Sequence, residues 1–151
     1  MDDYRGDVYR LMLATNRCVG FYTKTAKENH IKENTLLLMD ILSDGKQHSQ
    51  KQICKDWVIP KTTLNTIVGE CVKKGYIVLL QQEHSKEKLI SLTDTGKLFA
   101  ETVTAEMKNV VQQAMEKIKK EYPFDFISAY EKYVDYLQQE CGTEQGRTTH
   151  E

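Results

Sequence analysis

The side chains best suited to recognition chemistry in this sequence are the polar groups between Lys61 and Lys73. If this segment is a helix, one face carries Thr62, Thr66 and Lys73, with Asn65 at its flank. An Asn amide can form two hydrogen bonds with an adenine edge, and a Thr methyl can contact a thymine methyl. A Lys at either end can contact phosphate. These residue types point to contacts with double-stranded DNA.

The candidate DNA contacts come from this segment and from a polar tip that follows it. They are Lys61, Thr62, Thr63, Asn65, Thr66, Lys73, His84, Ser85 and Lys86. Residues 46–88 contain eight Lys and four acidic side chains, whereas residues 101–151 contain six basic and ten acidic ones. The whole chain has a net charge of −1, so only the basic middle segment is suited to a polyanion.

No arrangement of residues points to catalysis, a metal or a cofactor. The sequence lacks a Gly-rich phosphate loop, a G-x-S-x-G motif and an H-E-x-x-H motif. Cys18, Cys54, Cys71 and Cys141 include no C-x-x-C pair, so zinc-site spacing is absent and free thiols are expected. We therefore expect no enzyme and no bound cofactor.

A short helix, a turn and a longer helix must position the polar face. Ser49 suits the N-cap of the first helix, which is predicted to extend to Asp56. Pro60 suits the start of the second helix, and Gly75 suits its end after Lys74. The residues expected on the inner faces are Ile53, Cys54, Trp57, Leu64, Ile67, Val68, Cys71 and Val72.

Two strands and a further helix are predicted next. Residues 76–81 (YIVLLQ) and 88–93 (KLISLT) have strand character, and residues 83–87 form an exposed tip between them. Thr93 suits the N-cap of a helix that extends to about Glu121. This order predicts a winged helix-turn-helix over residues 31–96, a shape whose second helix fits the DNA major groove. The fold class is mainly α with a small β-hairpin wing (α+β).

Helices are also expected on both sides of the winged region. Residues 4–28 and 94–140 carry apolar stripes, and we expect them to form a two-fold dimer interface. Residues 142–151 are polar and are expected to be a disordered tail. No long apolar run predicts a transmembrane helix, and residues 1–20 are too polar for a signal peptide. We expect a cytoplasmic protein.

Residues 31–100 resemble the MarR family of bacterial transcription regulators. The resemblance is carried by IPKTTLNTIVGECVKKGYI and KLISLTDTGKLF in this order and spacing, and the outer helices match that family's dimerisation helices. It implies one MarR-like domain over residues 1–151 and a homodimeric repressor on a palindromic operator. It also implies that a small aromatic effector releases the DNA. Candidate effector contacts are Phe21, Tyr22, His30 and Trp57.

The sequence departs from that family's pattern at the wing tip. The family usually carries Asp-x-Arg there, with the Arg in the minor groove, whereas this chain has His84-Ser85-Lys86. Lys86 retains the positive charge but lacks the planar guanidinium. Thr66 and Glu70 also stand where family members often carry Arg. We therefore expect the helix to read DNA more securely than the wing.

Two alternatives to DNA-binding regulation remain open at this point. The altered wing tip favours a winged-helix protein-interaction module with weak or no DNA readout. Cys18 lies next to Arg17, and a neighbouring cation favours a reactive thiolate, so a thiol-based redox sensor is the second alternative.

Overall fold

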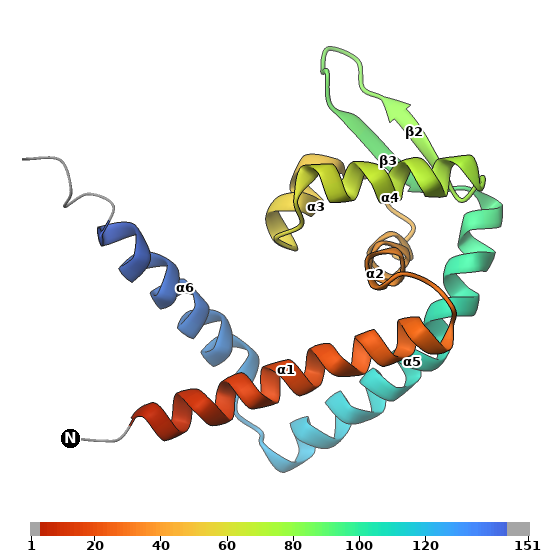
Figure 1. The fold of residues 1–151 in the computed structure, drawn as a ribbon. Coiled ribbons are helices and arrows are strands. Elements are labelled where there is room, and N and C mark those ends of the chain that lie inside the picture. The colour runs from red at the N-terminus through yellow and green to blue at the C-terminus, as the bar shows by residue number, and fades with distance from the viewer. Residues whose placement is uncertain (1–3, 145–151) are drawn as a thin grey trace, which may run out of the picture. The chain divides into compact units, whose positions relative to one another are not determined.

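A computed structural model describes residues 4–144, with side chains described for residues 4–142 (Figure 1). The elements are α1 (Tyr4–Glu28), α2 (Glu33–Leu42), β1 (His48–Ser49), α3 (Gln50–Asp56), α4 (Lys61–Lys73), β2 (Ile77–Gln81), β3 (Lys88–Leu92), α5 (Asp94–Glu121) and α6 (Phe126–Glu144). The chain divides into two compact units, Met1–Lys108 and Asn109–Glu151. The predicted fold class, mainly α with a β wing, is confirmed.

The first unit contains the winged helix-turn-helix. Its antiparallel sheet has the order β1-β3-β2, and Ile90 at the middle of β3 pairs with His48 on one side and Leu79 on the other. The sequence pattern predicted β2 and β3 but not the two-residue strand β1. The long hairpin formed by β2 and β3, residues 77–92, is the wing (Figure 1).

The core of this unit lies where α2, α4, α5 and the sheet meet. Its largest fully buried side chains include Leu36, Leu38, Met39, Leu42, Leu64 and Ile90. Each fully buried Leu or Ile contributes about 1.5–3 kcal/mol through removal of apolar surface from water. Ala100, Val103 and Met107 of α5 are also buried. This packing fixes the orientation of α4, because its inner face belongs to the core.

The helix ends follow the predicted local chemistry. Ser49 is the N-cap of α3, and its Oγ accepts a hydrogen bond from the Gln52 amide at 3.1 Å. Thr93 caps α5 in the same way, because its Oγ1 accepts from the Gly96 amide at 3.0 Å. Gly45 and Gly75 follow α2 and α4 with φ of 76° and 75°, which is the left-handed conformation expected of glycine after a helix.

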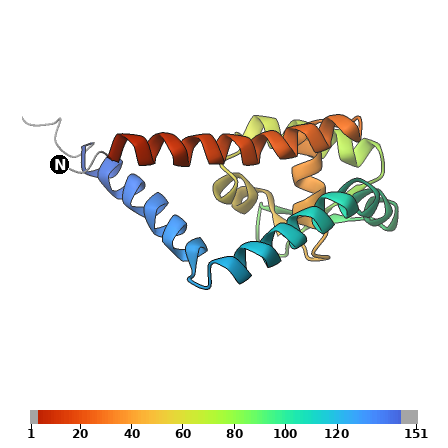
Figure 2. The same ribbon diagram turned by 90° about the horizontal axis from the view of Figure 1, so that it is seen from below.

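Helix α1 contacts the remainder of the first unit mainly through its C-terminal turns. Thr25 and Ala26 are its two buried residues, and α1 contacts α2 there (Figures 1 and 2). Most of the side chains between Tyr4 and Lys24 are exposed. The predicted span of 4–28 agrees with the observed helix.

The second unit consists of the second part of α5 and helix α6. The α6 helix begins at Phe126, and the side chain of the preceding Asp125 caps it. The Asp125 carboxylate accepts hydrogen bonds from the amide of Ser128 at 3.1 Å and from its hydroxyl at 2.6 Å. The α6 helix continues to Glu144, and the rest of the tail predicted at residues 142–151 lies outside the described residues. Among the described helices, none has the length and apolar character needed to cross a membrane.

Candidate nucleic-acid interface

The outer face of α4 presents most of the predicted DNA contacts. Lys61, Thr62, Asn65, Thr66 and Lys73 are exposed, and Thr63 is half-buried. The opposite face is fixed in the core by Leu64, Ile67, Val68 and Cys71, each at most 4% exposed. Since the two faces share one rigid helix, burial of the apolar stripe directs the polar stripe outward.

The polar groups on this face have few partners within the protein. Among residues 4–142, the side chains of Lys61, Asn65 and Lys73 make no hydrogen bond or ion pair. Thr66 donates its hydroxyl to the Thr62 carbonyl at 3.0 Å, and the residue as a whole is exposed. A ligand with donors and acceptors of its own can therefore pair with Asn65 without breaking an internal contact.

Glu70 is the acidic side chain of α4, and it forms an ion pair with a lysine of the same protein. Its Oε1 lies 2.6 Å from the Nζ of Lys32, which immediately precedes α2. This hydrogen bond lowers the pKa of Glu70, and the positive charges of Lys32, Lys74 and Lys73 lower it further. The pair links α4 to α2 and reduces the repulsion that Glu70 would exert on a polyanion.

The wing tip is shaped by Ser85. The Ser85 carbonyl accepts a hydrogen bond from the Gln81 side-chain amide at 2.8 Å, and its hydroxyl accepts from the Glu87 backbone amide at 3.0 Å. His84 occupies the left-handed region with a φ of 65°. His84 and Lys86 are exposed, whereas Ser85 is half-buried. Ser85 therefore holds the turn, while Lys86 presents its charge to solvent.

Two hydrogen-bonded joints hold the wing against the helix-turn-helix. Ser49 caps α3 and also donates its hydroxyl to the carboxylate of Glu87, which directly precedes β3 at the tip end of the wing. Thr93 donates its hydroxyl to the Gly75 carbonyl at 2.5 Å, and its amide donates to the Tyr76 carbonyl at 3.0 Å. The first joint connects the start of α3 to the tip end of the wing, and the second connects the end of α4, the base of the wing and the start of α5. The sequence indicated the caps but not these second partners.

At the Thr93 joint, the start of α5 packs closely against the backbone of Tyr76, because residue 96 is a glycine. A Cβ added at Gly96 would lie 1.9 Å from the Tyr76 carbonyl oxygen, so no other residue fits without displacement of backbone. Next to it, the rings of Tyr76 and Phe99 stack with centroids 4.2 Å apart and an interplanar angle of 7°. The sequence offers no signal for this role of Gly96, because the clash involves a residue twenty positions earlier.

Exposed lysines surround the polar face and extend to the wing. They are Lys51 and Lys55 on α3, Lys61, Lys73 and Lys74 on or next to α4, and Lys86 and Lys88 on the wing. Among the acidic groups nearby, Glu70 pairs with Lys32, and Glu87 accepts a hydrogen bond from Ser49. Residues 46–88 contain eight Lys against four acidic side chains, an excess of positive charge that suits phosphate contacts.

The turn between α3 and α4 differs from the predicted arrangement. Trp57 was expected on the inner face but is 50% exposed. It is the C-cap of α3, where the helix ends and the chain reverses, so its ring no longer follows the inner stripe. Val58 is 87% exposed with a φ of 52°, which is rare for a β-branched residue. Cys54 and Val72 are also less buried than the stripe predicted.

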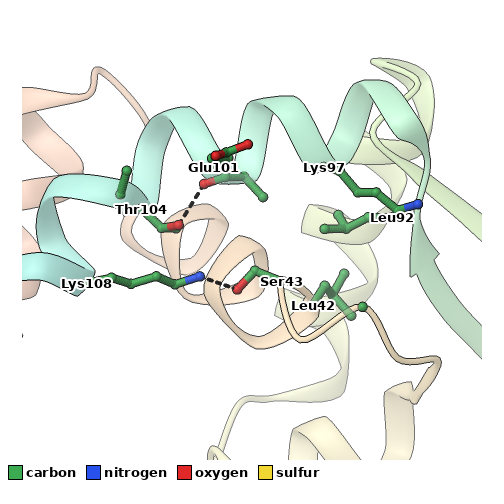
Figure 3. Close-up of a pocket in the computed structure, with 10 residues that line it drawn as sticks. Leu42, Ser43, Leu92, Lys97, Glu101, Thr104 and Lys108 are labelled. Carbon is green, nitrogen blue, oxygen red and sulfur yellow. Dashed lines mark hydrogen bonds between the residues drawn. The ribbon is translucent and has the colours of Figure 1, made fainter. Parts of the chain in front are cut away.

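The four candidate effector contacts come from α1, from the loop that follows it and from the end of α3. Phe21 and Tyr22 form an edge-to-face pair with centroids 5.3 Å apart. Burial raises the pKa of Tyr22, as do the neighbouring Cys18 and Asp40. His30 is exposed after α1 with a φ of 55°. A cavity of about 470 Å³ between α2, β3 and α5 is lined by none of these residues or Trp57 (Figure 3).

The cysteines lie in different environments. Cys71 is buried in the inner stripe of α4, and burial raises the pKa of its thiol. Cys18 and Cys141 are exposed, and all four are free thiols. Among the described residues, no three His, Cys, Asp or Glu side chains gather as a metal site requires.

Comparison with known proteins shows a clear likeness in fold. No protein-family model and no curated protein sequence matches the chain. Among solved structures, the MarR family regulator NMB1585 from Neisseria meningitidis is similar with a TM-score of 0.62 and 20% identity, covering 97% of this chain and 96% of that one.

Two further structures extend the likeness. S. aureus MepR in its DNA-binding conformation has a TM-score of 0.74 at 15% identity, covering 86% of this chain and 97% of its own. NadR in complex with 4-hydroxyphenylacetate has a TM-score of 0.59 at 15% identity, covering 93% and 92%. At these identities the likeness shows the fold. The chain therefore has the winged-helix fold of MarR family transcriptional regulators, as the sequence resemblance predicted.

Proposed function

We propose that this protein is a sequence-specific DNA-binding regulator of transcription that acts as a homodimeric repressor. The observation that carries the proposal is the outward face of α4, where Asn65 has no internal partner and Leu64, Ile67 and Val68 fix the opposite side. An α-helix fits the major groove, and Asn is suited to paired hydrogen bonds with adenine. The surrounding lysines supply phosphate contacts.

Two helices outside the winged region support a homodimer. Exposed apolar residues of α1 are Tyr4, Tyr9, Met12, Leu13, Val19 and Tyr22. Those of α6 are Ile127, Tyr130, Val134, Tyr136 and Leu137, and four of these recur at helical spacing. Large exposed apolar surfaces mark interaction sites. Two copies would place their α4 helices about 34 Å apart, one turn of DNA, and so read a palindromic operator.

We further propose that a small aromatic effector controls DNA binding. The similar protein NadR has been solved with 4-hydroxyphenylacetate, which supports an effector of this class. Phe21, Tyr22, His30 and Trp57 remain candidate contacts at the boundary of α1 and the helix-turn-helix. Effector binding would then change the placement of α4 and weaken the complex with the operator.

The test is a binding titration with the full chain. Fluorescence anisotropy would use the upstream region of its own gene and a scrambled duplex of the same length and composition. Light scattering on the same sample gives the oligomeric state. We expect a dimer that prefers the upstream region and whose affinity falls steeply between about 50 and 200 mM salt, because phosphate contacts release counterions. Absence of binding at about 50 mM salt would contradict DNA regulation.

One observation favours protein interaction as a second function. Trp57 and Val58 form an exposed apolar pair at the entry to α4, at 50% and 87% exposure. Aromatic residues of this kind are enriched in protein interfaces. A partner recovered without DNA, and lost with Trp57→Ser but not with Asn65→Ala, would support that function.

A further inference from the structure

Glu87 is an acidic residue at the wing tip, on the surface that faces DNA in the proposed function. It lies between Lys86 and Lys88 and is half-buried, whereas both lysines are exposed. Phosphate groups repel a carboxylate, so the charge of Glu87 by itself opposes DNA binding. A favourable role for Glu87 must therefore come from its contacts within the protein.

A continuous chain of hydrogen bonds passes through Glu87 from the start of α3 to the wing tip. The Ser49 hydroxyl accepts from the Gln52 amide at 3.1 Å, which caps α3, and donates its own proton to the Glu87 carboxylate. The Glu87 amide donates to the Ser85 hydroxyl at 3.0 Å, and the Ser85 carbonyl accepts from the Gln81 side chain at 2.8 Å. A hydroxyl has one donor and two acceptor sites, so Ser49 can cap α3 and bind Glu87 at the same time.

The strand pairing places Ser49 within reach of the wing tip. Ser49 pairs with Leu89 in the ladder of β1 and β3, and Glu87 lies two residues before Leu89, on the same side of the chain. The β1 strand ends at Ser49, so its backbone ladder with β3 stops short of the tip. The hydrogen bond from Ser49 to Glu87 therefore attaches the tip to α3 where the ladder has ended.

We propose that Glu87 is a positioning residue for Lys86, and that its hydrogen bond with Ser49 fixes the wing tip relative to α3 and α4. The carboxylate holds the turn that carries Lys86, and so keeps the lysine charge where it can meet a phosphate. A charged acceptor and partial burial both strengthen this hydrogen bond. The role of Lys86 rests on the proposed DNA-binding function, whereas fixation of the tip in the free protein does not.

The first measurement is amide hydrogen exchange at the wing tip, on the full chain without DNA. Glu87→Met removes the acceptor, and Ser49→Asp retains a good helix cap that cannot donate to Glu87. We expect either variant to lower the protection factor of the amide at position 87 by at least about threefold. Ser49→Asp combined with Glu87→Gln should restore it, because the new side-chain amide can donate to the new carboxylate and the pair keeps its total charge.

The second measurement is DNA affinity at several salt concentrations. Glu87→Met removes a negative charge, so a purely electrostatic role predicts tighter binding. The proposal predicts binding that is weaker by at least about threefold at about 50 mM salt, and a slope of log affinity against log salt reduced by about 1, because one phosphate contact is lost. Lys86→Ala should then change little when it is added to Glu87→Met.

Gln82→Glu is the control for the negative charge that Ser49→Asp adds. Gln82 lies at the same tip but takes no part in the chain of hydrogen bonds through Glu87. Its variant should leave the amide at position 87 protected and the salt slope unchanged. Thermal unfolding confirms that each variant folds.

Three results would overturn the proposal. They are tighter DNA binding by Glu87→Met, wild-type protection at position 87 in both Glu87→Met and Ser49→Asp, and a double variant that stays as unprotected as Ser49→Asp alone. If protection changes as expected but the chain binds no DNA, the fixation of the tip by Glu87 stands and the proposed regulatory function fails.

Discussion

The recognition helix α4 and the wing tip are held by different kinds of contact. The inner face of α4 is anchored by four side chains that are at most 4% exposed, Leu64, Ile67, Val68 and Cys71. The wing tip is held by hydrogen bonds around Ser85 and by the contact of Ser49 with Glu87. Base readout needs fixed geometry, whereas phosphate contact needs mainly charge. If the proposed function holds, this difference gives base readout to α4 and phosphate contact to the wing.

The largest effect is expected from Gly96→Ala. This residue lies at the Thr93 joint, which connects the end of α4 to the base of the wing. The new Cβ would lie 1.9 Å from the Tyr76 carbonyl oxygen, so backbone must move at the base of the wing. We expect the free energy of unfolding in urea to fall by about 3 kcal/mol, as in other substitutions that force strain on packed structure. DNA binding should be lost with it.

Gly69→Ala is the matched control for that variant. Gly69 lies within α4 with open space around its Cβ position, so alanine should raise stability by roughly 0.5–1 kcal/mol through helix propensity. If Gly96→Ala were as stable as Gly69→Ala, close packing at the Thr93 joint would not be what holds the wing to α4.

The second prediction separates readout from charge. Asn65→Ala should cost about 1–3 kcal/mol of binding at one base pair and relax the preference there. Lys86→Ala should weaken binding to all sequences alike and reduce the slope of log affinity against log salt by about 1. Titrations over operator variants at several salt concentrations measure both quantities.

The opposite pattern would reverse the assignment of roles. If Lys86→Ala changed the preferred base and Asn65→Ala changed only the salt slope, the wing would be the reading element. Lys88→Ala, at the start of β3 and two residues beyond Lys86, is a control for the loss of a wing charge.

Local patterns predicted the elements that carry the interface. The stripe of Leu64, Ile67 and Val68 follows the helical period, and the caps at Ser49 and Thr93 depend on the residues next to them. These features need no knowledge of distant segments, so a single sequence suffices to find them. The same holds for the exposed Lys86 at the wing tip, where polar residues lie between two strands.

Features that depend on distant segments were not predictable. The clash at Gly96 involves Tyr76, the Lys32–Glu70 pair joins two helices, and the cavity takes residues from near Leu42, from Leu92 and from α5. Inward placement of Trp57 was wrong because periodicity cannot tell where α3 ends and the turn begins. The candidate effector contacts Phe21, Tyr22, His30 and Trp57 stay a prediction from the sequence.

The third prediction compares two strained residues, one beside each region. Val58, before α4, has a φ of 52°, and His84, at the wing tip, has a φ of 65°. A β-branched residue tolerates this conformation less well than His. Val58→Gly should therefore raise the free energy of unfolding by about 1 kcal/mol, since Val58 is 87% exposed and glycine loses little burial.

His84→Gly is the comparison for that variant. We expect a change close to zero, because His occupies the left-handed region at lower cost and glycine adds freedom to the unfolded chain. Thermal and urea unfolding of the two variants give the difference. An equal gain at both sites would mean that the turn into α4 is no more strained than the wing tip.

The smallest effect on stability is expected from the ion pair between Lys32 and Glu70, which links α4 to α2. Among the described residues, no ion pair of this kind holds the wing tip. The pKa of Glu70 is lowered in the folded protein by its hydrogen bond with Lys32. The folded state therefore holds the carboxylate charged at pH values where the unfolded chain already binds a proton. This contribution to stability is complete above the unfolded pKa of about 4.3 and is lost as the pH falls through the lower folded pKa. Because the pair is partly exposed, its contribution is small.

Urea unfolding of the wild type and of Lys32→Met between pH 7 and pH 3 measures this contribution. The variant should be less stable at pH 7, and the two curves should converge as the pH falls, because protonation of Glu70 removes the interaction in the wild type as well. Glu83→Gln on the wing is the control, since Glu83 has no ion-pair partner among the described residues. Curves for Lys32→Met that run parallel to the wild type at every pH would show that Glu70 does not anchor α4 electrostatically, and the contrast with the wing would then rest on burial alone.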